Sequence, residues 1–135
     1  MTDVGSSTAA DKRLRIVLAD DHAVMRQALR SILEHNIDVT VVGEATDGNE
    51  AVSMAVALMP DIMIVDVNMP RMDGIEATRQ IKHKRPAITV IGLTVIDSTH
   101  VTDAMKAAGA EAVLLKDASE QLHETIKALV QRGMT

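Results

Sequence analysis

The chain contains no phenylalanine, tyrosine, tryptophan or cysteine. Without cysteine it can form neither a disulfide, nor a thiolate metal site, nor a thiol redox switch. Without aromatic rings its core must be built from valine, isoleucine, leucine, alanine and nine methionines, and methionine is an adaptable filler of apolar cores. Any mechanism that depends on the movement of an aromatic ring is excluded.

Long apolar runs and an excess of positive charge are also missing. The apolar runs are too short to span a bilayer, and the N-terminus lacks the apolar core of a signal peptide, which predicts a cytoplasmic protein without membrane contact. The net charge of −5 disfavours a nucleic-acid surface, because phosphate binding requires clustered lysine and arginine. The one basic cluster, residues 82–85, is expected to be a solvated helix end.

What is present indicates one globular domain. The 135 residues are 47% apolar and 24% charged, values typical of a folded chain. Residues 1–11 are small and polar and are predicted to be a flexible tail or linker, which leaves 12–135 as the domain. Predicted strands cover 14–19, 39–44, 62–66, 87–93 and 112–115, and predicted helices cover 22–35, 51–59, 74–84, 98–108 and 118–132. This alternation predicts a doubly wound α/β fold, a five-stranded parallel sheet with helices on both faces.

Two local patterns add detail to the predicted helices. Apolar spacing predicts one buried face for each of the first two helices. The residues on these faces are Val24, Met25, Ala28, Leu29, Ile32 and Leu33 in the first, and Ala51, Val52, Ala55, Val56 and Met59 in the second. Three helices open with the spacing Asp-x-x-Glu, in which the aspartate caps the first turn. These three pairs are Asp47/Glu50, Asp73/Glu76 and Asp117/Glu120.

Polar residues follow four of the five strands, where an open parallel sheet binds its ligands. They are Asp20, Asp21, Asp66, Thr94 and Lys116. Carboxylates a few ångströms apart repel by several kcal/mol at an effective dielectric of about 20, so a cation is expected among them. Oxygen ligands favour a hard ion such as Mg²⁺. His22 lies beside the acid pair, and a minor role for it stays open.

These residue types suit attack on a phosphorus centre. The Asp66 oxygen is the expected nucleophile, Lys116 and the cation neutralise the phosphoryl oxygens, and Thr94 donates a hydrogen bond. A rigid strand end holds the Asp66 oxygen in place, and the loop that follows it is expected to wrap the metal.

Four short motifs carry a resemblance to a known family. They are "ADD" at 19–21, "IVDVNMPRMDG" at 64–74, "GLT" at 92–94 and "LLKD" at 114–117. Together, in this order, they resemble the receiver domain of bacterial two-component response regulators over residues 14 to about 130. The likeness is greatest to receivers that precede a helix-turn-helix output domain, or to those of hybrid histidine kinases. The resemblance implies a flavodoxin-like fold with strand order 2-1-3-4-5.

The resemblance also implies a role for each site residue. Asp66 would accept a phosphoryl group from the phosphohistidine of a sensor histidine kinase or phosphotransfer domain. Asp21 and Asp66 would bind Mg²⁺ directly, Asp20 through water and Asn68 through its backbone carbonyl. The remaining implied roles are contacts to the phosphoryl group by Thr94 and Lys116.

A receiver of this kind is a phosphoacceptor rather than an enzyme. It catalyses its own phosphotransfer and its own dephosphorylation, and within a longer chain it could belong to a hybrid kinase. The resemblance implies a weak tendency to dimerise and no direct nucleic-acid contact.

Two positions depart from the family pattern. Val113 stands where receivers usually carry an aromatic residue, and Val95 stands where they carry alanine or glycine. The first departure leaves open a degenerate receiver that acts as an interaction module without phosphorylation. A haloacid-dehalogenase-like phosphatase is disfavoured because Asn68 replaces its second aspartate, and a nucleotide-binding module is disfavoured because no phosphate-binding glycine motif is present.

Overall fold

The computed structural model describes residues 13–35 and 38–133, which contain a single parallel sheet with strand order β2-β1-β3-β4-β5. The strands are β1 (Leu14–Ala19), β2 (Val39–Ala45), β3 (Ile62–Asp66), β4 (Thr89–Thr94) and β5 (Ala112–Leu115). Both the flavodoxin-like fold and the strand order are confirmed. The tail predicted over residues 1–11 lies outside the described residues.

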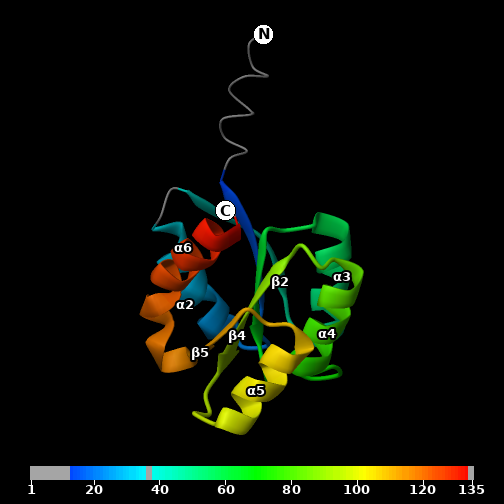
Figure 1. The fold of residues 1–135 in the computed structure, drawn as a ribbon. Helices are drawn as coiled ribbons and strands as arrows, with labels where there is room; N and C mark the ends of the chain where they lie inside the picture. The colour runs from blue at the N-terminus through cyan, green and yellow to red at the C-terminus, as the bar shows by residue number, and fades with distance from the viewer. Residues whose placement is uncertain (1–12, 36–37, 134–135) are drawn as a thin grey trace.

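Helices cover both faces of this sheet (Figure 1). α2 (Ala23–Glu34) and α6 (Leu122–Gly133) pack on one face. α3 (Gly48–Leu58), α4 (Gly74–Lys84) and α5 (Thr99–Ala108) pack on the other. None of the helices in the described part of the chain is long and apolar enough to cross a membrane.

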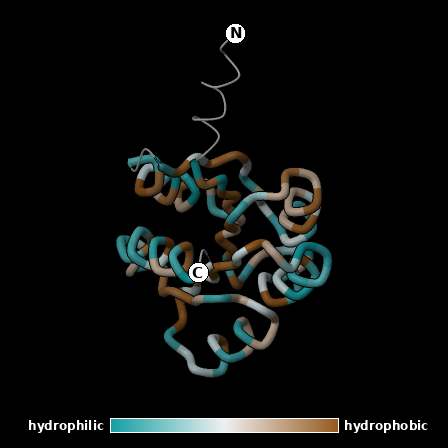
Figure 2. The backbone as a smooth tube through the Cα atoms, turned by 45° about the horizontal axis from the view of Figure 1, so that its top comes forward, coloured by the Kyte–Doolittle hydropathy of each residue, from teal (hydrophilic) through white to brown (hydrophobic). Residues whose placement is uncertain are grey.

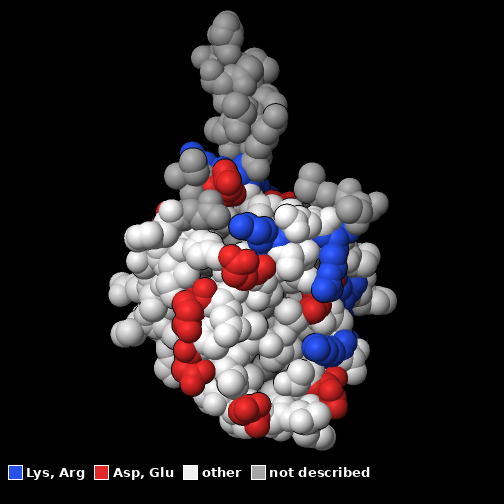
Figure 3. Space-filling view, turned by 60° about the vertical axis from the view of Figure 1, so that its left-hand side comes forward, with Lys and Arg blue, Asp and Glu red and all other residues white. Residues whose placement is uncertain are grey.

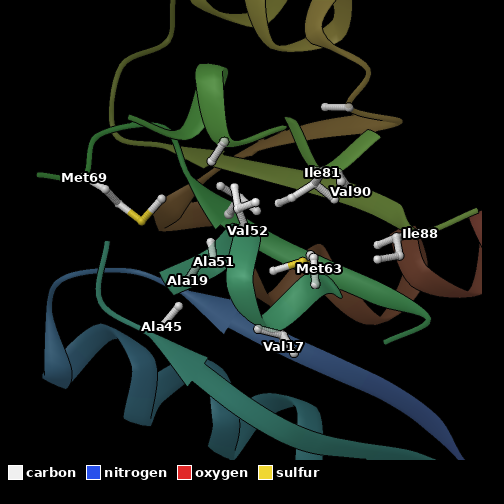
Figure 4. Packing of buried hydrophobic residues seen from close by; sticks show 14 of the residues in the cluster. Val17, Ala19, Ala45, Ala51, Val52, Met63, Met69, Ile81, Ile88 and Val90 are labelled. Atoms are coloured by element: carbon white, nitrogen blue, oxygen red, sulfur yellow. The ribbon is translucent and has the colours of Figure 1, made fainter. Parts of the chain in front are cut away.

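Each face of the sheet forms its own apolar core. Successive strand residues point to opposite faces, so Val17 and Met63 pack under α3 and α4, whereas Leu18 and Ile64 pack under α2 and α6. Figure 4 shows the first cluster, in which Met63 fills space beside Val17 and no aromatic ring takes part. In Figure 2 the central strands are brown, which marks hydrophobic residues. The teal, hydrophilic segments lie mostly on the outer helices. Every residue of β3 is buried, as a strand covered on both faces requires.

Two of the three predicted helix caps are confirmed. The Asp47 side chain accepts a hydrogen bond from the Glu50 N–H, and the Asp73 side chain accepts one from the Glu76 N–H. The Glu50 carboxylate in turn accepts the Thr46 N–H at 2.7 Å. The bonds to Asp47 and Asp73 satisfy backbone donors that the first turn of a helix leaves without partners, and the bond from Thr46 ties the preceding residue to that turn.

The third predicted cap is wrong. Asp117 lies inside a 3₁₀ segment, Lys116–Gln121, whose first turn has no side-chain cap. The helix predicted from residue 118 therefore begins at Leu122. The end of β5 turns directly into this tighter segment, so Asp117 does not occupy the extended position that an N-cap requires. The predicted strand 87–93 is also shifted and runs from Thr89 to Thr94.

Four apolar residues predicted to be buried are exposed, among them Ala28 of α2. Val24 is 80% exposed because it lies in the first turn of α2, where residues 21–24 are all exposed to solvent. Val56 is 37% and Met59 60% exposed. Met59 follows the end of α3 with a φ of 46°, a left-handed conformation, so the helical repeat no longer applies to it.

Candidate functional site

Three aspartates, Asp20, Asp21 and Asp66, form an acid cluster at the carboxyl ends of β1 and β3. Ala19 pairs with Val65 in the parallel ladder, so the residues that follow each strand lie at the same level. Asp20 is 1% and Asp66 2% exposed. Carboxylate oxygens of the cluster and a ring nitrogen of His22 lie within 4.8 Å of one another. The structure thus brings together the acids that the sequence placed at one sheet edge.

Lys116 supplies the positive charge that faces this cluster. Its Nζ lies 3.0 Å from Asp20 Oδ2 and 3.1 Å from Asp66 Oδ2, and its side chain is 13% exposed. Burial lowers the pKa of Lys116, but its favourable interactions with the two aspartates outweigh that effect and leave the pKa raised. The ammonium therefore remains protonated at neutral pH.

The environment of Asp66 changes the pKa of its carboxyl group. Burial raises the pKa of Asp66. The hydrogen bond from Lys116 opposes this rise, and the charge of Asp20 adds to it. One ammonium thus faces three carboxylates, so the described residues leave the cluster with a surplus of negative charge.

The donor set fits a divalent cation. Asp20 Oδ2 is buried and, despite the nearby ammonium, has no hydrogen bond of standard geometry within the described residues. Clustered carboxylate oxygens are the ligands of hard cations such as Mg²⁺. The side chain of Asp21 is 33% exposed, which leaves the cluster open to water on one side.

His22 closes the turn that carries the two adjacent acids. Its backbone N–H donates to Asp20 Oδ1 at 2.9 Å. Its ring Nδ1 lies 3.2 Å from Asp20 Oδ1 and 3.1 Å from Asp21 Oδ1. The ring is 68% exposed, so it caps the cluster from the solvent side.

Asn68 and Thr94, the other two predicted site residues, lie beside the cluster. The Asn68 N–H donates to Asp66 Oδ1 at 3.1 Å. Thr94 is 2% exposed, and its Oγ1 accepts the Ile96 N–H at 3.1 Å. In this conformation the hydroxyl is engaged within its own loop, and the hydrogen bonds found for it among the described residues do not reach Asp66.

The loop after β3 packs tightly against the strand that it leaves. The Gly74 N–H donates to the Val67 carbonyl at 2.8 Å. A Cβ at Gly74 would lie 2.1 Å from the Asp66 carbonyl oxygen, so only glycine fits there. Arg71 in the same loop has a φ of 66°, and its Nε donates to Asp47 Oδ2 at 2.8 Å. This ion pair joins the loop to the start of α3 and was not anticipated.

A second unanticipated contact lies behind the acid cluster. Arg26 donates to the Asp20 carbonyl and to Glu44, and Arg30 pairs with the same glutamate. The two arginines are one helical turn apart, and Glu44 comes near the end of β2. The spacing of the two arginines is the feature of the sequence from which a shared acidic partner could have been predicted.

The two departures from the family pattern have different environments. Val95 is 67% exposed next to Thr94. Val113 is half-buried and packs against the core on the side of α3, α4 and α5. A Cβ at Gly92 would lie 3.6 Å from a Val113 methyl group and 2.6 Å from the fully buried Met105. A valine and a flexible methionine thus occupy the space around β4 below Thr94.

The charged surface agrees only in part with the predicted solvated cluster at 82–85. Lys84 is exposed, but Lys82 is 17% exposed and its Nζ lies 2.7 Å from Glu111 Oε2. On the face shown in Figure 3, acidic side chains form a column at the left, basic side chains lie near the top and at the right with acidic ones beside them, and neutral side chains fill the middle. That face carries no continuous basic surface.

Comparison with known proteins places this geometry in a family. Residues 16–127 match the response regulator receiver domain. The chain is 39% identical over 118 residues to the transcriptional regulatory protein YdfI of Bacillus subtilis (strain 168), covering 87% of this chain and 55% of YdfI. It is 38% identical over 116 residues to LiaR of the same strain, covering 85% and 55%. The chain thus spans about half the length of these curated relatives.

A solved structure shows the same fold. The signal receiver domain of the putative response regulator NarL from Mycobacterium tuberculosis aligns with a TM-score of 0.81 and 30% identity, covering 89% of this chain and 95% of that chain. The order of the strands, the acid cluster and the family match agree, and the chain therefore belongs to the receiver domains of response regulators.

Proposed function

We propose that this domain is a phosphorylation-dependent switch in which Asp66 accepts a phosphoryl group. The observation that carries the proposal is the position of Asp66 at the end of a buried strand, 3.1 Å from Lys116 and within 4.8 Å of two further aspartates. A carboxylate fixed by a rigid sheet needs little reorganisation to meet an incoming phosphorus atom.

The expected donor is the phosphohistidine of a sensor histidine kinase or of a phosphotransfer domain. An oxygen of Asp66 attacks the phosphorus, the bond between phosphorus and the histidine nitrogen breaks, and an acyl phosphate forms on Asp66. The donor imidazole leaves with the electron pair of that bond and takes up a proton from water. Lys116 then neutralises a phosphoryl oxygen.

The reaction requires Mg²⁺ in this proposal. Asp20, Asp21, Asp66 and the backbone carbonyl of Asn68 would hold it, with Asp20 acting through water. Bound Mg²⁺ supplies positive charge to the phosphoryl oxygens during transfer. Asp21 is the most exposed of the three acids, so the donor would approach from its side.

Thr94 is the proposed relay to the rest of the protein. Its hydroxyl bonds to Ile96 in the present conformation. Reaching a phosphoryl group on Asp66 requires it to exchange that bond for one to a phosphoryl oxygen, which releases residues 95–97. The signal would pass through this loop, because Val113 supplies no ring to rotate.

The wider setting is also a proposal. A histidine kinase partner places the domain in the cytoplasm, acting as a phosphoacceptor without nucleic-acid contact of its own and with a weak tendency to dimerise. YdfI and LiaR are transcriptional regulatory proteins, so we propose a transcriptional regulator as the whole protein.

The experiment uses acetyl phosphate as donor, with and without Mg²⁺, and intact-mass spectrometry as the readout. The wild type should gain one phosphoryl group only with Mg²⁺, and Asp66→Asn should gain none. Asp73→Asn is the matched control, because it changes an aspartate of the same loop to a residue that also caps helices. Modification of Asp66→Asn would refute the assignment.

Val113 favours one second candidate, a receiver that acts as an interaction module without phosphorylation. The two candidates differ in the same assay. If neither acetyl phosphate nor a phosphorylated kinase modifies the wild type, the interaction module replaces the switch.

A further inference from the structure

We propose that Arg26 is a positioning residue that holds the Asp20–Asp21 peptide in the orientation needed to bind a divalent cation. The inference rests on the proposed magnesium site and extends it to a residue outside the acid cluster. Arg26 contacts the backbone of the turn and none of its carboxylates among the hydrogen bonds of the described residues.

The guanidinium of Arg26 joins three elements. It extends from the first turn of α2, and its side chain is 16% exposed. Its Nη1 donates to the Asp20 carbonyl oxygen at 2.7 Å, and its Nε donates to Glu44 Oε1 on β2 at 2.8 Å. The planar guanidinium fork holds these two acceptors through donors whose directions are fixed relative to each other, whereas a lysine ammonium in its place would have one nitrogen on a flexible chain.

The bond to the Asp20 carbonyl oxygen restrains the Asp20–Asp21 peptide. The Asp20 carbonyl belongs to the same planar peptide as the N–H of Asp21. The Asp20 N–H, on the preceding peptide, donates to the Ala45 carbonyl at 3.0 Å. With both backbone groups of Asp20 held from the side of β2, the directions in which the Asp20 and Asp21 side chains leave the chain are fixed.

Glu44 is the anchor of this arrangement. The hydrogen bond from Arg26 is the largest cause of a lowered pKa at Glu44, and the bond from Arg30 adds to it. Glu44 is therefore a carboxylate at neutral pH. Arg30 pairs with Glu44 and with Glu34, and its hydrogen bonds and ion pairs within the described residues do not include the turn at 20–22. The chain thus offers its own control, a second arginine on the same glutamate.

Charge and geometry have opposite effects on cation binding. The positive charge of Arg26 repels a divalent ion, so if charge were its only influence, Arg26→Met would bind Mg²⁺ more tightly than wild type. If Arg26 positions the peptide, the same substitution loses a supporting contact and binding weakens. Arg26→Lys keeps the charge and removes the fork, so it isolates the geometric effect.

The test is the Mg²⁺ affinity measured by isothermal titration calorimetry on wild type, Arg26→Lys, Arg26→Met and Arg30→Lys. Loss of a residue that orients metal ligands typically weakens binding about 10- to 100-fold, and we expect Arg26→Lys to lose at least about 10-fold. We expect Arg30→Lys to remain within about twofold of wild type. Thermal melts without Mg²⁺ show whether each variant is folded at the temperature of the titration, so a loss of affinity in a folded Arg26→Lys is not a loss of structure.

The inference is overturned if Arg26→Lys binds Mg²⁺ as wild type does, if Arg26→Met binds it more tightly, or if Arg30→Lys loses as much affinity as Arg26→Lys. Should the Arg26 variants fail to fold, Glu44→Gln keeps Arg26 and weakens its anchor. That variant must bind Mg²⁺ several-fold more weakly, and unchanged affinity overturns the inference. A wild type that binds no Mg²⁺ refutes the proposed metal site itself, whereas wild-type binding with unaffected Arg26 variants refutes only the role of Arg26.

Discussion

Replacing Lys116 with methionine removes the only ammonium in contact with the acid cluster among the described residues. Its Nζ lies 3.0 Å from Asp20 Oδ2 and 3.1 Å from Asp66 Oδ2. Methionine fills a similar volume without the charge, so the perturbation is electrostatic. In the absence of Mg²⁺ the variant leaves two buried carboxylates without their cation.

The expected loss follows from the burial of the pair. Removing one member of a buried ion pair costs about 3–5 kcal/mol. Lys116 retains 13% exposure and Asp21 opens the cluster to water, so we expect the lower end, about 3 kcal/mol. For a domain of this size that corresponds to a fall in Tm of about 10 °C.

The pH dependence has a definite sign. Burial already raises the pKa of Asp66, and Lys116 supplies the hydrogen bond that lowers it. In the variant the ionised Asp66 is less favourable, so its folded-state pKa rises further. The stability that protonated Asp66 contributes is complete below its unfolded-state pKa and is lost as the pH rises from there through its folded-state pKa. The deficit relative to wild type should therefore shrink as the pH is lowered from 8 to 5.

The assay is thermal unfolding in EDTA and in excess Mg²⁺, with Lys127→Met as the control at an exposed lysine of α6. Bound Mg²⁺ supplies the missing positive charge, so it should raise the Tm of Lys116→Met more than that of wild type. Two results would refute this prediction: a Tm of Lys116→Met equal to that of Lys127→Met, or an equal rise in Tm with Mg²⁺ for Lys116→Met and wild type.

Three further predictions concern the neighbourhood of the site. Asp66→Asn removes a buried carboxylate of raised pKa, so at pH 8 in EDTA its urea midpoint should exceed that of wild type, with the gap closing as pH falls; a lower midpoint at pH 8 contradicts this. Arg71 has a left-handed φ of 66° and pairs with Asp47; glycine relieves the strain and alanine does not, so Arg71→Gly should be more stable than Arg71→Ala by about 1 kcal/mol in urea. Equal stabilities would contradict the strain. A Cβ at Gly74 would lie 2.1 Å from the Asp66 carbonyl, so Gly74→Ala should lose about 3 kcal/mol in urea, and a loss below about 1 kcal/mol would contradict that clash.

The strand pattern of the sequence predicted the sheet because its signals are local and strong. β3 is an apolar run followed by an acid, and its bounds, like those of β1, β5 and α4, agree with the prediction. Since parallel strands bring their carboxyl ends to one edge, the meeting of Asp20, Asp66 and Lys116 followed from topology alone.

The errors arose where a pattern had more than one structural meaning. The spacing of Asp117 and Glu120 fits a capping box, but the chain enters a 3₁₀ segment there. Val24 fits the helical repeat, but the first turn of α2 extends into solvent. Periodicity tells which residues share a face and not whether another element covers it.

The hydrogen bonds of Arg26 and Thr94 could not be predicted from the sequence pattern for another reason. The hydrogen bond from Arg26 to the Asp20 carbonyl depends on a side-chain rotamer and on the register of β1 against β2, which shifts between Ile16 and Val17. The hydroxyl of Thr94 likewise turns toward Ile96 through a loop conformation that no residue type specifies.

In the proposed switch, the acid cluster holds a divalent ion so that an oxygen of Asp66 can take up a phosphoryl group. Calorimetric titration with beryllofluoride, a mimic of that group, tests it most directly. We expect heat of binding for the wild type in the presence of Mg²⁺, and none in EDTA or for Asp66→Ala in Mg²⁺. Absence of heat for the wild type in Mg²⁺, or equal heat for Asp66→Ala, would contradict it.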